Sequence, residues 1–276
     1  MNSPTELSTV TRLLRSDVKQ AAEDAIVSPT LARYLVDYYY ISQDDRKRAH
    51  NQQRAMGEAE EPAAVVAWLA GQAGVLEDQI KRVLDAYTSQ HVMGSWMREI
   101  HGIGPVISAG LLAHIDIEKA PTVGHIWRFA GLDSSVKWSK GQKRPWNAGL
   151  KTLCWKVGQS FMKFHNAPEC YYGHIYRARK DYEIARNERG DNRALALELS
   201  AGVGKTTEAF KHLTDGHLPP GQIDARARRY AVKQFLADMH GEWYRRHFGA
   251  EPPLPYPIAI LGHAHLRQPP DRQSEE

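Results

Sequence analysis

A long positively charged stretch without any acidic residue is the feature of this sequence with the clearest chemical use. No carboxylate occurs between Asp133 and Glu169, whereas seven positive side chains do: Lys137, Lys140, Lys143, Arg144, Lys151, Lys156 and Lys163. Trp138, Trp146 and Trp155 are interleaved with them. A solvated surface usually mixes both signs, so this stretch predicts a surface that binds a nucleic acid. The alternative is a positive surface whose tryptophans lie in the core.

The second candidate for phosphate binding is a glycine turn, Gly102-Ile103-Gly104, followed by Pro105. Apolar residues at helical spacing predict a helix, a tight turn and a second helix over residues 96–115. Glycines let another backbone approach closely, and the free N–H groups at the start of a helix suit a phosphate. The pattern is typical of a helix-hairpin-helix motif, which grips a nucleic-acid backbone without reading bases. The alternative is a corner between two helices that uses its glycines for packing.

Two further motifs do not fit the chemistry that they suggest. Residues 201–207 end like a phosphate-binding P-loop, but Leu199 stands where the first glycine is needed, and helical residues precede the segment instead of a strand. We expect a loop between two helices there. The histidine pairs near the C-terminus lack the i, i+4 spacing and the carboxylate of a zinc site. We therefore expect no cofactor.

The rest of the chain reads as helices that would position these features. Apolar residues recur at helical spacing, and Pro or Thr mark several helix starts. The first third shows no strand alternation. The expected helices cover 3–19, Pro29 to Arg54, Pro62 to Tyr87, 96–115, Pro121 to Gly131, Pro168 to Arg189, 194–199 and Asp224 to Phe248.

The composition is compatible with an internal, globular protein. The 276 residues are 42% hydrophobic, which permits a sizeable core, and 36 Lys and Arg face 32 Asp and Glu. The only cysteines, Cys154 and Cys170, have no metal-like spacing and indicate a reduced compartment. No signal sequence or membrane-spanning apolar run is present, so we expect a cytoplasmic protein that does not contact membranes.

We predict a mainly α fold, a helical bundle around the helix-hairpin-helix unit with an extended, Pro-rich C-terminal tail. The expected divisions are an N-terminal helical region over 1–94, a hairpin domain over 95–166, a C-terminal helical region over 167–250 and a tail over 251–276. The tail is expected to be extended because prolines recur from Ala250 onward.

The order of several short motifs resembles a known family. Ile103-Gly104-Pro105 is followed by Ala109-Gly110-Leu111, then Phe129-Ala130-Gly131-Leu132, a basic loop with Ser139-Lys140-Gly141, and Asn147-Ala148-Gly149-Leu150 opening a helix. This order is similar to the C-terminal domain of IS110/IS116/IS902-type transposases and Piv-type DNA invertases, also called the transposase-twenty domain. The similarity covers roughly residues 97–164.

The resemblance implies a serine nucleophile in this domain, acting with a RuvC-like nuclease domain that bears four carboxylates. By position Ser139 corresponds to that serine, with Ser134 and Ser135 as weaker candidates. Nearby cations or Mg²⁺ would stabilise the charge on the transferring phosphoryl group. Residues 1–94 show none of the strand alternation or the early aspartate of the RuvC-like half. We therefore expect the chain not to be catalytic by itself.

Three functions remain in view. We favour a DNA-binding protein of mobile-element or phage origin that grips the phosphate backbone. The second is a transposase or recombinase that uses Ser139, with Mg²⁺ and a nuclease partner in trans. The third is an RNA-binding or structural scaffold subunit, and a homo-oligomer is compatible with all three. The expected DNA contacts are Gly102, Ile103, Gly104, Val106, Lys137, Lys140, Lys143, Arg144, Asn147, Lys151, Arg226 and Arg229.

Overall fold

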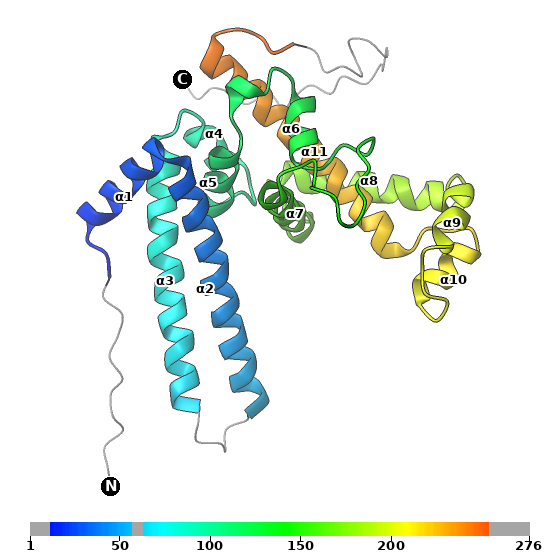
Figure 1. The fold of residues 1–276 in the computed structure, drawn as a ribbon, viewed down its shortest axis with the longest axis horizontal. Helices are drawn as coiled ribbons and strands as arrows, with labels where there is room; N and C mark the ends of the chain where they lie inside the picture. Colours follow the sequence, from blue (N-terminus) through cyan, green and yellow to red (C-terminus); the bar gives the residue numbers. More distant parts are fainter. Residues whose placement is uncertain (1–11, 57–62, 254–276) are drawn as a thin grey trace. The chain divides into compact units, whose positions relative to one another are not determined.

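The computed structural model describes residues 12–56 and 63–253, and all regular structure in these ranges is helical, which confirms the mainly α prediction. In chain order the helices are α1 Arg15–Val27, α2 Pro29–Met56, α3 Ala63–Gln90, α4 Gly94–Glu99, α5 Pro105–His114, the 3-10 helix η1 Ile117–Lys119, α6 Val123–Phe129, α7 Ala148–Lys163, α8 Tyr171–Glu188, α9 Arg193–Ser200, α10 Glu208–Thr214 and α11 Pro220–Phe248 (Figure 1).

The chain forms two compact units. The N-terminal unit comprises Met1–Glu99 and Gly104–Asp116, and the C-terminal unit comprises Ile100–Ile103 and Ile117–Glu276. The glycine turn therefore straddles the division: Gly102 belongs to the C-terminal unit, whereas Gly104 and α5 belong to the N-terminal unit.

The N-terminal unit is built on the long hairpin of α2 and α3, which lie side by side (Figure 1). Helices α1 and α5 pack against both of them. Small buried residues such as Ala22, Ala32 and Ala109 permit close helix contacts, and Leu84 fills the interior. The Arg46–Glu77 ion pair, at 2.5 Å, joins α2 to α3 and satisfies a carboxylate that is only 9% exposed.

Several helix boundaries differ from the sequence prediction; the helix expected from Asp224, for example, begins at Pro220. Of the helix expected over 3–19, residues 3–11 lie outside the described ranges, and residues 12–14 are not helical. Helix α1 begins at Arg15, where the Asp17 carboxylate accepts the Leu14 N–H at 2.8 Å and caps the first turn. The helix expected from Pro168 starts at Tyr171, after a turn closed by the Cys170 N–H on Ala167. Helix α10 was not expected; Thr207 caps it.

Helix α11 is the spine of the C-terminal unit, and α6, α7 and α8 all pack on it. Phe161 of α7, Tyr172 of α8 and Phe235 of α11 meet in the core with ring centroids 5.1–5.6 Å apart. Asn147 caps α7 by accepting the Leu150 N–H at 2.8 Å, as expected for the Asn-led helix. These contacts fix α7 against α11, which becomes important for the site.

Helices α9 and α10 form a small lobe at one end of this unit. The buried side chain of Asn187 bonds both backbone groups of Leu218, accepting the N–H at 2.8 Å and donating to the carbonyl at 3.2 Å. Ala196, Leu213, Leu218 and Ile223 form its small apolar core. The loop predicted at 201–207 does lie between two helices, and helix α9 precedes it.

Residues 251–253 have no regular structure, and the rest of the expected tail lies outside the described residues. Among the helices in the described ranges, none has both the length and the apolar character needed to cross a bilayer.

Candidate nucleic-acid interface

The acid-free stretch begins as a loop between α6 and α7, here called the basic loop, residues 134–147. Its aromatic residues hold it together. The indole N–H of Trp138 donates to the Gln142 carbonyl at 2.7 Å, and the Arg144 guanidinium carbon lies 5.6 Å from the Trp138 ring centroid. Trp138 contacts Trp146 edge-on at 6.3 Å, and the Lys151 ammonium lies 3.9 Å from the Trp146 ring centroid. The loop thereby presents its cations in a folded arrangement without using carboxylates.

The positive side chains of the basic loop are exposed: Lys137, Lys140, Lys143 and Arg144. None of them forms an ion pair with a carboxylate of the described residues. Trp138 and Trp155 are 37% and 59% exposed, so these rings lie at the surface and not in the core. The alternative of core tryptophans is therefore wrong for these two residues.

Positive charge is concentrated in this stretch to an unusual degree. The whole chain has 36 Lys and Arg and 32 Asp and Glu, but residues 134–168 hold seven of the cations and no acid. The remaining residues therefore carry 29 cations against 32 acids, a net charge of −3. The excess positive charge of the protein resides entirely in one segment, which favours local contact with a polyanion over a general basic surface.

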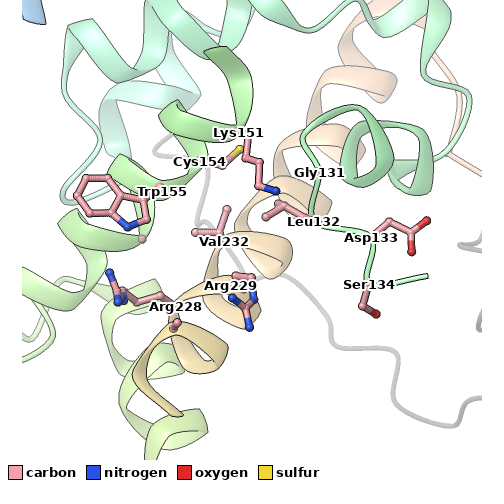
Figure 2. A pocket seen from close by; sticks show the side chains of 12 residues that line it. Gly131, Leu132, Asp133, Ser134, Lys151, Cys154, Trp155, Arg228, Arg229 and Val232 are labelled. Carbon is pink, nitrogen blue, oxygen red and sulfur yellow. The ribbon is translucent and has the colours of Figure 1, made fainter. Parts of the chain in front are cut away.

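Next to the basic loop, a pocket of about 360 Å³ opens between α7, α11 and the turn after α6. Lys151 and Trp155 reach it from α7, and Arg228 and Arg229 from α11 (Figure 2). Leu132, Cys154 and Val232 supply apolar surface, and Ser134 lies on the turn. The site therefore combines apolar walls, an exposed indole and several cations in one concavity.

A glycine makes this packing possible. A Cβ at Gly158 of α7 would approach Arg228 Cβ and Val232 Cγ2 at 3.3 Å each. Because Gly158 has no side chain, α11 can come close to α7 and bring Arg228 and Arg229 beside Lys151.

Lys151 and Arg229, the pocket cations without an ion pair in the described part of the chain, lie among other positive charges that disfavour their protonated forms. Burial lowers the pKa of Lys151, and repulsion from Arg144 and Arg229 lowers it further. Partial burial also lowers the pKa of Arg229, followed by repulsion from Arg226 and Arg228. Neither Lys151 nor Arg229 forms an ion pair with a described carboxylate. A bound anion would relieve this repulsion.

The single carboxylate at the pocket is already engaged. Asp133 accepts hydrogen bonds from the backbone N–H and hydroxyl of Ser135, at 2.9 and 2.7 Å, and these bonds lower its pKa. Lys233 lowers the pKa of Asp133 further, and the Lys233 ammonium also lies 4.2 Å from the Trp127 ring centroid. In Figure 2 the Asp133 carboxylate points away from Lys151 and Arg229.

Other arginines of α11 are neutralised. Arg226 pairs with Glu183 of α8 at 3.2 Å and donates to Asn192 at 3.1 Å. Arg228 pairs with Asp224 at 2.7 Å within α11. Of the two residues of α11 that the sequence analysis named as contacts, Arg229 therefore lines the pocket and Arg226 lies in an ion pair outside its lining.

The glycine turn is packed in a way that the sequence did not reveal. Gly102 has φ +89°, and a Cβ there would lie 3.0 Å from the Ser160 hydroxyl of α7, which donates to the Gly102 carbonyl. Ile103 and Val106 are buried, at 5% and 7% exposure, so their side chains cannot be the contacts. Gly104 is exposed at the start of α5, with nothing within 4 Å of a Cβ.

The candidate serines lie at different places. Ser139 is exposed on the basic loop, where its carbonyl accepts the Gln142 N–H at 3.2 Å, and it does not line the pocket. Ser134 does line the pocket. No group of three or more His, Cys, Asp or Glu side chains in the described residues is arranged to hold a metal ion.

Sequence reasoning named Lys151 and Arg229 but gave Trp155 no place in a pocket with them. The usable signal was the i, i+4 spacing of Lys151 and Trp155 on α7 and of Ala225 and Arg229 on α11. Helical spacing places each pair on one face. It does not reveal that the two faces meet.

Fold and site together define a helical protein, over its described residues, with one acid-free cationic surface. Residues 95–169 match the model of the Transposase IS116/IS110/IS902 family, which confirms the resemblance seen in residues 97–164. The match supports a role related to transposition by mobile elements. It ends before α8, so the α11 wall of the pocket lies outside the matched segment. No curated protein and no solved structure matches the chain.

Proposed function

We propose that this protein binds the phosphate backbone of DNA through the basic loop and the cations of the α7–α11 pocket, as part of a transposition-related activity. The observation that carries the proposal is the concentration of seven cations and no acid in residues 134–168. Lys140, Lys143 and Arg144 would contact successive phosphates, and Lys151 and Arg229 would add two more. Asn147 would act by capping α7, since its side chain accepts the Leu150 N–H.

The test is the salt dependence of binding to a DNA duplex, measured by fluorescence anisotropy. Each phosphate contact contributes about 0.9 to the slope of log affinity against log salt. We expect the combined change Lys140→Ala, Lys143→Ala and Arg144→Ala to reduce the slope by about 2–3. The matched control changes Lys19, Lys47 and Arg48 to Ala, exposed cations of the N-terminal unit with the same total charge. Equal slopes in the two triple variants would contradict the proposal.

The start of α5 is the second proposed phosphate contact, because the first N–H groups of a helix have no partner within it. Gly104 allows a clean test: its φ is −87° and a side chain meets no atom there. We expect Gly104→Val to weaken DNA binding a few-fold while the protein stays folded by circular dichroism. Gly102 is unsuitable for the same test, because its positive φ and its contact with Ser160 make any side chain destabilising.

A serine-dependent strand transfer is the second candidate, supported by Ser134, which lines the same pocket as Lys151 and Arg229. A serine hydroxyl that attacks a phosphodiester loses its proton, forms a phosphoserine ester with one DNA end and releases the oxygen of the other end. Supercoiled DNA, Mg²⁺ and a RuvC-like nuclease would be incubated with the protein and with Ser134→Ala and Ser139→Ala. A covalent protein–DNA adduct that one of these changes abolishes would identify the nucleophile. If no reaction gives an adduct, the strand-transfer candidate is rejected and only the DNA-binding proposal remains.

A further inference from the structure

We propose that the α7–α11 pocket accepts one unpaired nucleotide, with its base against the Trp155 indole and its phosphate between Lys151 and Arg229. This inference rests on the proposed nucleic-acid binding and specifies the form of nucleic acid that binds most tightly. A duplex backbone would still contact the basic loop, but only a nucleotide outside the base stack could enter the pocket.

The shape of the pocket is the first argument. A volume of about 360 Å³ falls at the lower end of the roughly 300–1,000 Å³ found for small-molecule sites. A duplex backbone could contact the basic loop and the exposed cations Lys151 and Arg229, but a smooth duplex surface would leave the interior of such a concavity unfilled. A single flipped or bulged nucleotide is a group that can fill it.

The chemistry of the walls is the second argument. Trp155 is 59% exposed, and its ring contacts no other aromatic ring or cation in the described residues, so a planar face is available at the pocket. Leu132 and Val232 supply apolar surface to the same pocket (Figure 2). Nucleobases stack on such indoles regardless of sequence. The pocket thus joins a stacking surface to a phosphate site.

The charge pattern is the third argument. Lys151 and Arg229 reach the same pocket from different helices, repel each other and have no carboxylate partner in the described residues. Asp133, the nearby acid, is held by Ser135. A phosphate group would satisfy both cations at once, whereas a neutral ligand would leave the repulsion in place.

The experiment compares four fluorescent probes of one sequence at about 0.1 M salt: a DNA duplex, the same duplex with one bulged thymidine, single-stranded DNA and single-stranded RNA. We expect the bulged duplex to bind about tenfold tighter than the plain duplex, because stacking of one base on an aromatic ring is worth about this factor or more. When the bulged duplex binds more tightly than the plain duplex, the two single strands report whether the natural source of the nucleotide is DNA or RNA.

Two changes test the pocket without altering charge. Trp155→Ala removes the stacking surface, and Ala225→Phe fills the pocket from α11. Both should abolish the preference for the bulged duplex, whereas Trp155→Phe should keep it. Trp155→Ala should also leave plain-duplex affinity within about twofold, because Trp155 is not among the proposed duplex contacts. Matched controls are Tyr34→Ala, an aromatic residue of similar exposure in the N-terminal unit, and Ala178→Phe on the exposed side of α8.

The outcomes separate this inference from the proposed function. Equal binding of plain and bulged duplex by the wild type, or a preference that survives both Trp155→Ala and Ala225→Phe, overturns the inference. Salt-dependent duplex binding that responds to the basic-loop triple variant would still stand in that case. Absence of binding to every probe overturns both.

Discussion

Arg226 and Arg229 lie one turn apart on α11, yet their surroundings are opposite. Arg226 faces Glu183, which is only 2% exposed and also pairs with Arg179. Arg229 faces Lys151 across the pocket and finds no carboxylate there. The charges around Glu183 form ion pairs that join α8 and α11. Arg229 forms no ion pair with a carboxylate of the described residues, so its charge is available to a bound anion. The comparison teaches that an arginine's function follows from the helix opposite it and not from its own helix.

The largest expected effect is on the paired region. Glu183→Ala should lower the free energy of unfolding by about 3 kcal/mol, because it leaves Arg179 and Arg226 without their shared buried carboxylate. Urea denaturation followed by circular dichroism measures this change. A loss below about 0.5 kcal/mol would show that the two regions do not differ in their contribution to stability.

Replacing each of the two arginines by glutamine, in separate variants, tests the difference between them directly. Arg226→Gln should cost about 2 kcal/mol of stability, because a charge-assisted hydrogen bond to Glu183 is lost, and should change DNA affinity little. Arg229→Gln should leave stability within about 0.5 kcal/mol and weaken DNA binding about fivefold to tenfold. Urea denaturation and fluorescence anisotropy on the same preparations check both. The reverse pattern would assign the phosphate contact to Arg226.

The next test gives Arg229 an ion-pair partner. Ala225→Glu places a carboxylate four residues before Arg229, the spacing at which helix ion pairs form. It should weaken DNA binding by about tenfold, because it neutralises one cation and repels phosphate, while stability changes by less than about 0.5 kcal/mol. Ala225→Gln is the isosteric control in the same anisotropy assay. Equal affinity of the two variants would exclude the pocket from the DNA contact.

The smallest expected effect is a pH dependence at Lys151. Its pKa is lowered in the free protein, chiefly by burial, so it loses its proton at a lower pH than an ordinary lysine. A bound phosphate favours the protonated form of Lys151. The affinity for DNA is therefore highest at pH values below the lowered pKa and declines as pH rises through it. We therefore expect DNA affinity to decline at a lower pH than the ordinary lysine pKa of about 10.4 would give, measured by anisotropy across the alkaline range. Lys151→Arg should remove the decline, and an identical decline in this variant would assign it to another group.

The two walls of the pocket differ in whether they lie within the segment that matches the family. The matched segment, residues 95–169, contains the turn, the basic loop and α7, whereas α8 and α11 lie beyond it. The pocket therefore joins a transposase-type segment to a helix for which no matching protein was found. A property that depends on Arg229 therefore rests on a residue outside the matched segment.

Much of the local structure followed from the sequence. Pro29 and Asn147 mark helix starts where the structure has them, and Gly131 follows α6 as expected. These signals are local, because a cap or a missing N–H acts within one turn of helix. The start of α1 was missed because apolar spacing continues before Leu14 in the sequence, whereas the Asp17 carboxylate caps the helix at Leu14. Helix α10 was missed because seven residues are too few for a clear period.

The helical fold and the concentration of positive charge in residues 134–168 could both be predicted from the order of the residues. Three features could not: which cations stay unpaired, the pocket that Trp155 shares with Arg229, and the packing of Gly102 on Ser160. The difference lies in the range of the interactions. Helix formation and capping act within a few residues, whereas neutralisation of a charge depends on a partner that the packing of α7, α8 and α11 brings near.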